Sequence, residues 1–217
     1  MRRLLAIETS GAVCSAAVSV DGMLTSSIEI LRSNVHDEML AGVVTSACEH
    51  AGIPVSDIDI VAVSSGPGSF TGLRIGASFA KGLCYTGTPK LLAVPSHVAM
   101  MAAALEVARL SGASGIACAI GSHRDLVYLS TSPCDELDIE ADAVLMTTDE
   151  ARARIDAASM LIVGPAAGLL TALPVSGLSR HSARFVAYAA WIMLAKGSPF
   201  ADANQFVPNY HQEFQPR

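Results

Sequence analysis

A glycine-rich stretch, SSGPGSFTGLRIG over residues 64–76, is the part of this sequence whose composition first suggests chemistry. It holds four of the chain's 17 glycines, and glycine-rich loops between a strand and a helix cradle phosphates with their backbone amides. A Walker A loop places Lys directly after its last glycine, but Leu73 follows Gly72 here. The dinucleotide pattern G-x-G-x-x-G fails as well, because its last position, counted from the first glycine, is Thr71. The stretch therefore matches no standard phosphate loop.

A second candidate for phosphate chemistry lies near the start of the chain, where Glu-Thr-Ser-Gly offers hydroxyl and backbone donors in one hairpin. Sugar and acetate kinases need two such hairpins and an Asp that holds magnesium. No second hairpin stands out near residues 115–125, where Gly121 replaces the acid. We therefore expect no independent kinase activity. A weak nucleotide site is predicted at Glu8, Thr9, Ser10 and Gly11.

The spacing of the other reactive residues gives no support for metal or nucleophile chemistry. The six histidines stand at positions 36, 50, 97, 123, 181 and 211, so none forms the H-x-x-x-H pair that places two imidazoles on one helix face. The five cysteines form no C-x-x-C pair, and their odd number argues against a disulfide framework or a zinc ribbon. The nucleophile pattern G-x-S-x-G is absent. We predict no catalytic residue, no metal ligand and no cofactor.

The bulk composition indicates a protein that does not grip nucleic acid by itself. The formal net charge is −6, and no basic cluster exists beyond Arg2-Arg3 and the loose pair Arg152 and Arg154. A protein that binds RNA alone usually carries a basic stripe, so we expect any tRNA to be held through a partner. The apolar run after the basic start is too short for a signal peptide, and no stretch approaches the roughly 20 apolar residues of a membrane span. We expect a cytoplasmic protein with buried, reduced thiols and no membrane contact.

An alternation of strands and helices must position these residues. Three strands joined by short turns, with Asp21-Gly22 as a two-residue hairpin, predict an antiparallel meander at the start of the chain. Asn34 is placed to cap the helix that follows. The elements predicted for the first half are strands 3–8, 13–20, 23–31, 58–65 and 90–95, and helices 35–51, 73–87 and 96–110.

The pattern restarts after residue 112 in a less regular form. The elements predicted there are strands 115–120, 126–130, 141–146 and 160–164, helices 147–155 and 182–196, and an irregular polar tail. Three antiparallel strands that lead into right-handed parallel crossovers describe a ribonuclease-H-like lobe. We therefore predict an α/β protein of two ribonuclease-H-like lobes of the actin-like ATPase (ASKHA) type, the second lobe reduced. The lobes are expected at residues 1–110 and 111–217.

Small residues recur at helical spacing from the end of the glycine loop onward. Gly72, Gly76 and Ala80 lie four apart on one face, and Ser78 and Gly82 form a neighbouring row. An interior glycine costs a helix about 1 kcal/mol relative to Ala, so something must offset that cost. A flat face lets another backbone approach closely. Two interpretations stay open: a surface that docks another helix pair, or packing inside the chain's own core.

Several segments carry a resemblance to a known family. The stretch GPGSFTGLRIG looks like the signature of the bacterial tRNA threonylcarbamoyladenosine biosynthesis protein TsaB family, and LLAIETSGAVCSAAV is similar to that family's first hairpin. His36, the segment LLAVPSHVAM and Pro208-x-Tyr210 fit as well. The resemblance is dense over about residues 1–100 and thin afterwards. The chain departs from the family where Gly121-Ser122-His123 stands in place of Asp-Ala-Arg, and where Glu8 stands in place of Asp.

This resemblance implies a role. TsaB-like proteins are small members of the actin-like ATPase superfamily and act as non-catalytic partners of the related transferase TsaD. With a TsaE-like ATPase subunit, the pair helps to install threonylcarbamoyl on the tRNA adenosine beside the anticodon, so tRNA is met only through the complex. The alternative is a TsaD-like transferase or metallopeptidase-type enzyme in its own right.

The resemblance also implies a partner interface. In the family, two helices of the N-terminal lobe, here residues 35–51 and 73–86, pack against the equivalent helices of TsaD. When that partner is absent, the same helices pack against a second copy, so a homodimer is expected. The interface residues implied are His36, Met39, Leu40, Val43, Gly68, Phe70, Thr71, Gly72, Arg74, Ile75, Gly76 and Phe79.

Overall fold

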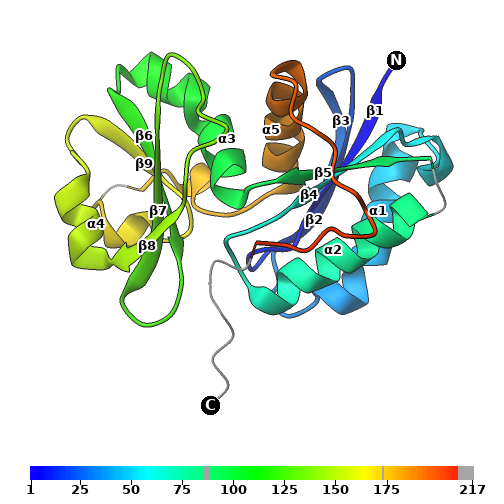
Figure 1. The fold of residues 1–217 in the computed structure, drawn as a ribbon, viewed down its shortest axis with the longest axis horizontal. Coiled ribbons are helices and arrows are strands. Elements are labelled where there is room, and N and C mark those ends of the chain that lie inside the picture. Colours follow the sequence, from blue (N-terminus) through cyan, green and yellow to red (C-terminus); the bar gives the residue numbers. More distant parts are fainter. Residues whose placement is uncertain (86–87, 173, 210–217) are drawn as a thin grey trace.

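Two β-sheets with helices around them form the fold (Figure 1), as seen in a computed structural model that describes residues 1–85, 88–172 and 174–209. The first sheet has five strands in the order β3-β2-β1-β4-β5, and the second has four in the order β8-β7-β6-β9. Both sheets combine antiparallel hairpins with parallel strands. This arrangement agrees with the predicted α/β fold of two lobes, the second reduced.

The first sheet begins with the predicted meander. Its strands are β1 (Arg3–Glu8), β2 (Cys14–Val20), β3 (Met23–Ile30), β4 (Ile60–Ser64) and β5 (Lys90–Val94). Asp21 and Gly22 have positive φ angles of 47° and 90°, as a two-residue hairpin turn that matches the strand twist requires. β4 and β5 extend the sheet in parallel on the other side of β1. Burial on both faces explains the continuous apolar sequence of these parallel strands.

Helices cover both faces of this sheet. The α-helices of the described residues are α1 (His36–Ala51), α2 (Phe70–Tyr85), α3 (Ser96–Ser111), α4 (Thr148–Arg154) and α5 (Ala183–Ala195). α1 and α2 cover one face, where Leu5 and Ile7 are buried. α5 covers the other face, where Leu4 and Ala6 are buried. Because side chains alternate along a strand, β1 contributes to two separate cores.

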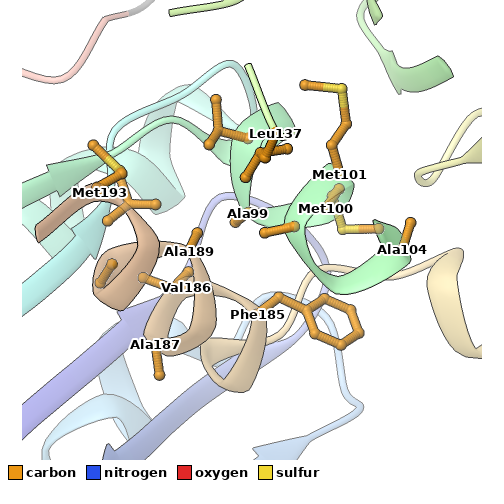
Figure 2. Close-up of a cluster of buried hydrophobic side chains, with 14 of the residues drawn as sticks. Ala99, Met100, Met101, Ala104, Leu137, Phe185, Val186, Ala187, Ala189 and Met193 are labelled. Atoms are coloured by element: carbon orange, nitrogen blue, oxygen red, sulfur yellow. The ribbon is translucent and has the colours of Figure 1, made fainter. Parts of the chain in front are cut away.

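α3 and α5 form the layer between the two sheets (Figure 1). α5 packs on β1 and β2, α3 packs on β6 and β9, and the two helices pack on each other. Figure 2 shows the buried side chains of this contact, with Met100 and Met101 on α3 and Phe185 and Met193 on α5. The lobe boundary at residue 110 stays a prediction, because α5 follows that boundary in sequence but packs on the first sheet.

The second sheet is smaller. Its strands are β6 (Gly115–Gly121), β7 (Leu126–Pro133), β8 (Val144–Thr147) and β9 (Met160–Val163). Short 3-10 helices within the described residues are η1 (Val55–Asp57), η2 (Ala167–Leu169) and η3 (Ser176–Leu178). β6, β7 and β8 are antiparallel, and β9 joins β6 in parallel. α4 begins with a capping box in which Thr147 and Glu150 each accept a hydrogen bond from the other's backbone amide.

The segment after α5 returns along the first sheet. The amide of Ala201 donates to the Leu91 carbonyl at 2.9 Å and bridges the free edge of β5. Lys81 Nζ donates to the carbonyl oxygens of Asn204 and Phe206, each at 3.2 Å. The predicted irregular tail is therefore held to α2 and β5 over this part of its length. Among the described residues, no helix has the length and apolar character needed to span a membrane.

The predicted elements are confirmed apart from their ends. The Asn34 cap is wrong, because α1 begins after Val35 without a side-chain cap and Asn34 has a φ of 58°. α2 begins at Phe70 rather than at residue 73, because residues that look like loop in the sequence, Gly72 among them, form its first turn. The predicted helix end at residue 87 and Tyr210 lie outside the described residues.

Candidate functional site

The glycine-rich stretch packs on the turn that follows β1. The amide of Ser69 donates to the Ser10 carbonyl at 2.7 Å, and a Cβ added at Gly68 would lie only 2.5 Å from the same oxygen. On its other side the loop meets the returning tail, because a Cβ at Gly66, which has a φ of 109°, would lie 2.2 Å from the Asn209 carbonyl. The space that a phosphate would need is therefore filled by the chain's own backbone.

The stripe of Gly72, Gly76 and Ala80 faces the interior of the chain. A Cβ at Gly72 would lie 2.0 Å from the Thr9 carbonyl oxygen, and a Cβ at Gly76 would lie 2.3 Å from Thr9 Oγ1. Thr9 Oγ1 donates to the Gly72 carbonyl at 2.8 Å, and Ala80 is fully buried in the core under α1 and α2. The docking interpretation of this stripe is therefore wrong, and so is the assignment of Gly72 and Gly76 to the interface. Their small size lets α2 approach the end of β1.

A different row of small residues on α1 and α2 faces outward. Among the described residues, a Cβ added at Gly42 or at Gly82 would meet no other atom within 4 Å. Ala41 and Ser78 are exposed as well and line a shallow groove of about 520 Å³ between the two helices. Each exposed helical glycine costs about 1 kcal/mol relative to Ala, with no contact within the described chain to offset it. A flat outer face thus exists, on a different side of α2 from the predicted stripe.

The residues predicted for the interface divide into two groups. The exposed or half-buried ones are Met39, Gly68, Phe70, Thr71, Arg74, Ile75 and Phe79. The buried ones are His36, Leu40, Val43, Gly72 and Gly76. His36 and Leu40 still line the groove, whereas Val43 belongs to the core under α1. The structure therefore brings His36, Leu40, Arg74, Ile75 and Phe79 together around one groove.

Polar groups mark the rim of this groove. His36 is 7% exposed, and its Nε2 has no hydrogen-bond partner among the described residues. The Arg74 guanidinium lies 3.9 Å from the centroid of the Phe70 ring, which is cation–π geometry, and Asp37 lines the groove from α1. An apolar floor with charged side chains at its edge is the usual composition of a protein contact surface.

A second hollow, of about 640 Å³, lies between the lobes. Ligand sites in open α/β sheets commonly lie at the carboxyl ends of strands, and the segments after β1, β6 and β9 line this cavity. Ser10 and Gly11, two of the predicted nucleotide residues, form part of its wall. The other two are buried: Glu8 accepts a hydrogen bond from the Ser64 hydroxyl at 3.1 Å, and Thr9 bonds to α2.

Arg180 and His181 line the same cavity and escaped prediction from the sequence. His181 is 4% exposed, and neither ring nitrogen has a partner among the described residues. Burial lowers its pKa, partly opposed by the charge of Glu8, so the imidazole is neutral at pH 7. Its ring packs against Gly11, where a Cβ would lie 2.4 Å from Nδ1. Only the fold brings residues so distant in sequence together, so no local pattern could have identified them.

The described residues contain no metal centre, because no group of three or more His, Cys, Asp or Glu side chains within them is placed to hold an ion. The five cysteines are free and buried. Burial raises the pKa of the Cys14 and Cys84 thiols to about 11, and at Cys14 the Glu8 charge adds to the effect. Since the thiolate is the reactive form, both side chains stay protonated and inert at neutral pH.

Known proteins similar in sequence carry two descriptions, and both name threonylcarbamoyl modification of tRNA. A family model described as TsaD, tRNA N6-adenosine threonylcarbamoyltransferase, matches residues 30–167. Two curated relatives named tRNA threonylcarbamoyladenosine biosynthesis protein TsaB, from Haemophilus influenzae and Escherichia coli, are each 32% identical, over 127 and 147 residues. These matches cover 58% and 66% of this chain, and they span 52% and 62% of the relatives' own length.

A solved structure is similar over nearly the whole chain. It is a Pseudomonas aeruginosa protein described as uncharacterized, with similarity to peptidase YeaZ. Its TM-score is 0.80 at 26% identity, and the match covers 98% of this chain and 100% of that one. These comparisons confirm the predicted resemblance to TsaB, and the match over nearly the whole chain supports the predicted α/β fold.

Because α2 packs closely on the end of β1, alanine substitutions at two of its glycines should change the free energy of unfolding in opposite directions. We expect Gly72→Ala to lower the free energy of unfolding by about 1–3 kcal/mol, because the new methyl group meets the Thr9 backbone. The matched control, Gly82→Ala, should raise it by about 0.5–1 kcal/mol, because the site is open and Ala favours the helix. Urea denaturation measures both values. Equal stability of the two variants would contradict the packing described here.

Proposed function

The chain belongs to the tRNA N6-adenosine threonylcarbamoyltransferase (TsaD) family, and on this premise we propose that it acts in tRNA threonylcarbamoyladenosine biosynthesis as a non-catalytic partner. Its partner in this proposal is a TsaD-like transferase, and a TsaE-like ATPase subunit completes the complex. The net charge of −6 supports a role in which the complex, rather than this chain alone, holds the tRNA.

The observation that carries this proposal is the outer face of α1 and α2, which we call the docking face. It comprises the groove between the helices, which Ala41 and Ser78 line, and the exposed glycines Gly42 on α1 and Gly82 on α2. Small residues let a partner's helices approach to short interaxial distance. The half-buried Ile75 and Phe79 would supply apolar contact area to a helix pair laid across the groove.

A large cation in the middle of the docking face should block the partner. We expect Ala41→Arg to weaken binding of the cognate TsaD-like protein at least tenfold, about 1.4 kcal/mol, because the side chain fills space that the partner's helices would occupy. Sedimentation velocity of the mixed proteins measures the affinity. Gly76→Arg would not serve, because its side chain would meet Thr9 inside the chain.

The matched control for this variant is Ala153→Arg, which adds the same side chain at an exposed position of α4 in the second lobe. It should bind the TsaD-like protein as the unmodified chain does. If Ala41→Arg folds and binds with unchanged affinity, the docking face has been assigned to the wrong surface.

The same docking face should form a homodimer when the TsaD-like partner is absent, because it would otherwise leave apolar surface in water. We expect sedimentation equilibrium to show a dimer that Ala41→Arg dissociates. Addition of the TsaD-like protein should replace the homodimer with a heterodimer, since both assemblies use one surface. A ternary complex that contains the intact homodimer would contradict the shared surface.

The alternative proposal, a transferase that works alone, predicts a different result. Supplied with ATP, threonylcarbamoyl adenylate and tRNA, the isolated chain should yield no modified adenosine in nucleoside digests analysed by mass spectrometry. The same mixture with the TsaD-like partner is the positive control. Product formation by the isolated chain would replace the partner role with a catalytic one.

A further inference from the structure

The proposed function involves only the docking face and assigns no role to the cavity between the lobes. That cavity measures about 640 Å³, within the range of about 300–1,000 Å³ that is usual for small-molecule sites. Segments from both lobes line it, so a bound molecule would contact both. Three properties of its wall identify the class of molecule that it suits.

The first property is charge. The chain as a whole is acidic, with a formal net charge of −6. Among the described residues that line the cavity, however, none is Asp or Glu, while the cation Arg180 is present. Arg180 takes part in none of the ion pairs formed within the described residues. The wall therefore favours an anion over a cation.

The second property is a set of unused hydrogen-bonding groups. The imidazole of His181 is buried without a partner among the described residues, although buried polar groups are normally paired. Within the described chain, the amides of Gly11 and Ala12 likewise donate to no acceptor. Ser10 Oγ accepts from the Ser96 hydroxyl at 3.2 Å, which leaves its own proton for another acceptor. These donors and Arg180 line one cavity.

The third property is an apolar wall. Leu31, Ile120 and Leu169 come from three separate segments and line the same cavity as Arg180. A small inorganic ion would leave these side chains without contacts. A molecule with an apolar body beside its anionic group would use both parts of the wall.

A magnesium-bound nucleotide fits these properties poorly. Magnesium in nucleotide sites is held by carboxylates together with phosphate oxygens, and the described lining residues supply no carboxylate. Glu8, which precedes the turn, is 1% exposed, and its Oε1 accepts from the Ser10 amide and the Ser64 hydroxyl. One oxygen of its carboxylate thus holds the turn, and burial keeps the side chain out of the cavity wall.

We propose that this cavity binds a small organic oxyanion, a carboxylate or a phosphate monoester with an apolar body, and that it does so without a metal ion. Arg180 and the amides of Gly11 and Ala12 hold the anionic group, and His181 donates to it. The apolar side chains from both lobes cover the body of the ligand. This binding site is independent of the docking face and of the role proposed for it.

Isothermal titration calorimetry of the isolated chain tests this site. The probes are benzoate, phenyl phosphate, inorganic phosphate and Mg-ATP, with EDTA added to all but the last. We expect benzoate or phenyl phosphate to bind roughly tenfold or more tightly than inorganic phosphate, because the ring contacts the apolar wall. Whichever binds more tightly identifies the carboxylate or the phosphate as the natural anionic group. Failure of both to bind, or tighter binding of Mg-ATP, would overturn the proposal.

Two variants locate the binding. Arg180→Gln, at an exposed position, should lower the affinity for the more tightly bound probe roughly tenfold. Arg154→Gln removes the same charge at an exposed site outside the cavity and should leave that affinity unchanged. His181→Leu should lower the affinity for this probe. It should not lower the thermal midpoint of unfolding of the free chain, because it replaces a buried imidazole that has no partner among the described residues. Equal affinities in Arg180→Gln and Arg154→Gln would place the anion elsewhere and end the proposal.

Discussion

The contact between Thr9 and the first two turns of α2 determines much of this structure. Thr9 follows the end of β1, and its carbonyl and hydroxyl lie where Cβ atoms of Gly72 and Gly76 would otherwise be. This approach sets the height of α2 above the sheet, and with it the width of the groove beside α1. It also fixes the turn at Ser10 and Gly11, which forms a wall of the cavity between the lobes. Both candidate surfaces therefore adjoin elements that the close packing of Thr9 on α2 positions.

The sequence predicts most of the elements because their signals are local. Apolar periodicity and the Asp21-Gly22 turn each act over a few residues, and the structure places strands and helices where they indicate. What the sequence could not predict is which row of small residues faces outward. At 3.6 residues per turn, Gly76 and Gly82 lie about 120° apart around the axis of α2. Only the packing against Thr9, distant in sequence, shows that the side of Gly76 is buried while Gly82 is exposed.

The residues that line the cavity could likewise be predicted only in part from the sequence. Ser10 and Gly11 could be proposed from their own neighbourhood, whereas Arg180 and His181 belong to an irregular segment before α5 that carries no motif. They join the first two only because α5 returns to the first sheet and packs against α3 (Figure 2). The core between α3 and α5 thus does more than join the lobes, since it also positions the positive side of the cavity.

Hydrogen–deuterium exchange of the chain, with and without its TsaD-like partner, tests the central claim most directly. The account predicts slower exchange in residues 36–51 and 70–85, the two helices of the docking face. The strands of the second sheet should exchange at the same rate in both states. Protection confined to the second sheet, with α1 and α2 unchanged in the complex, would contradict the account.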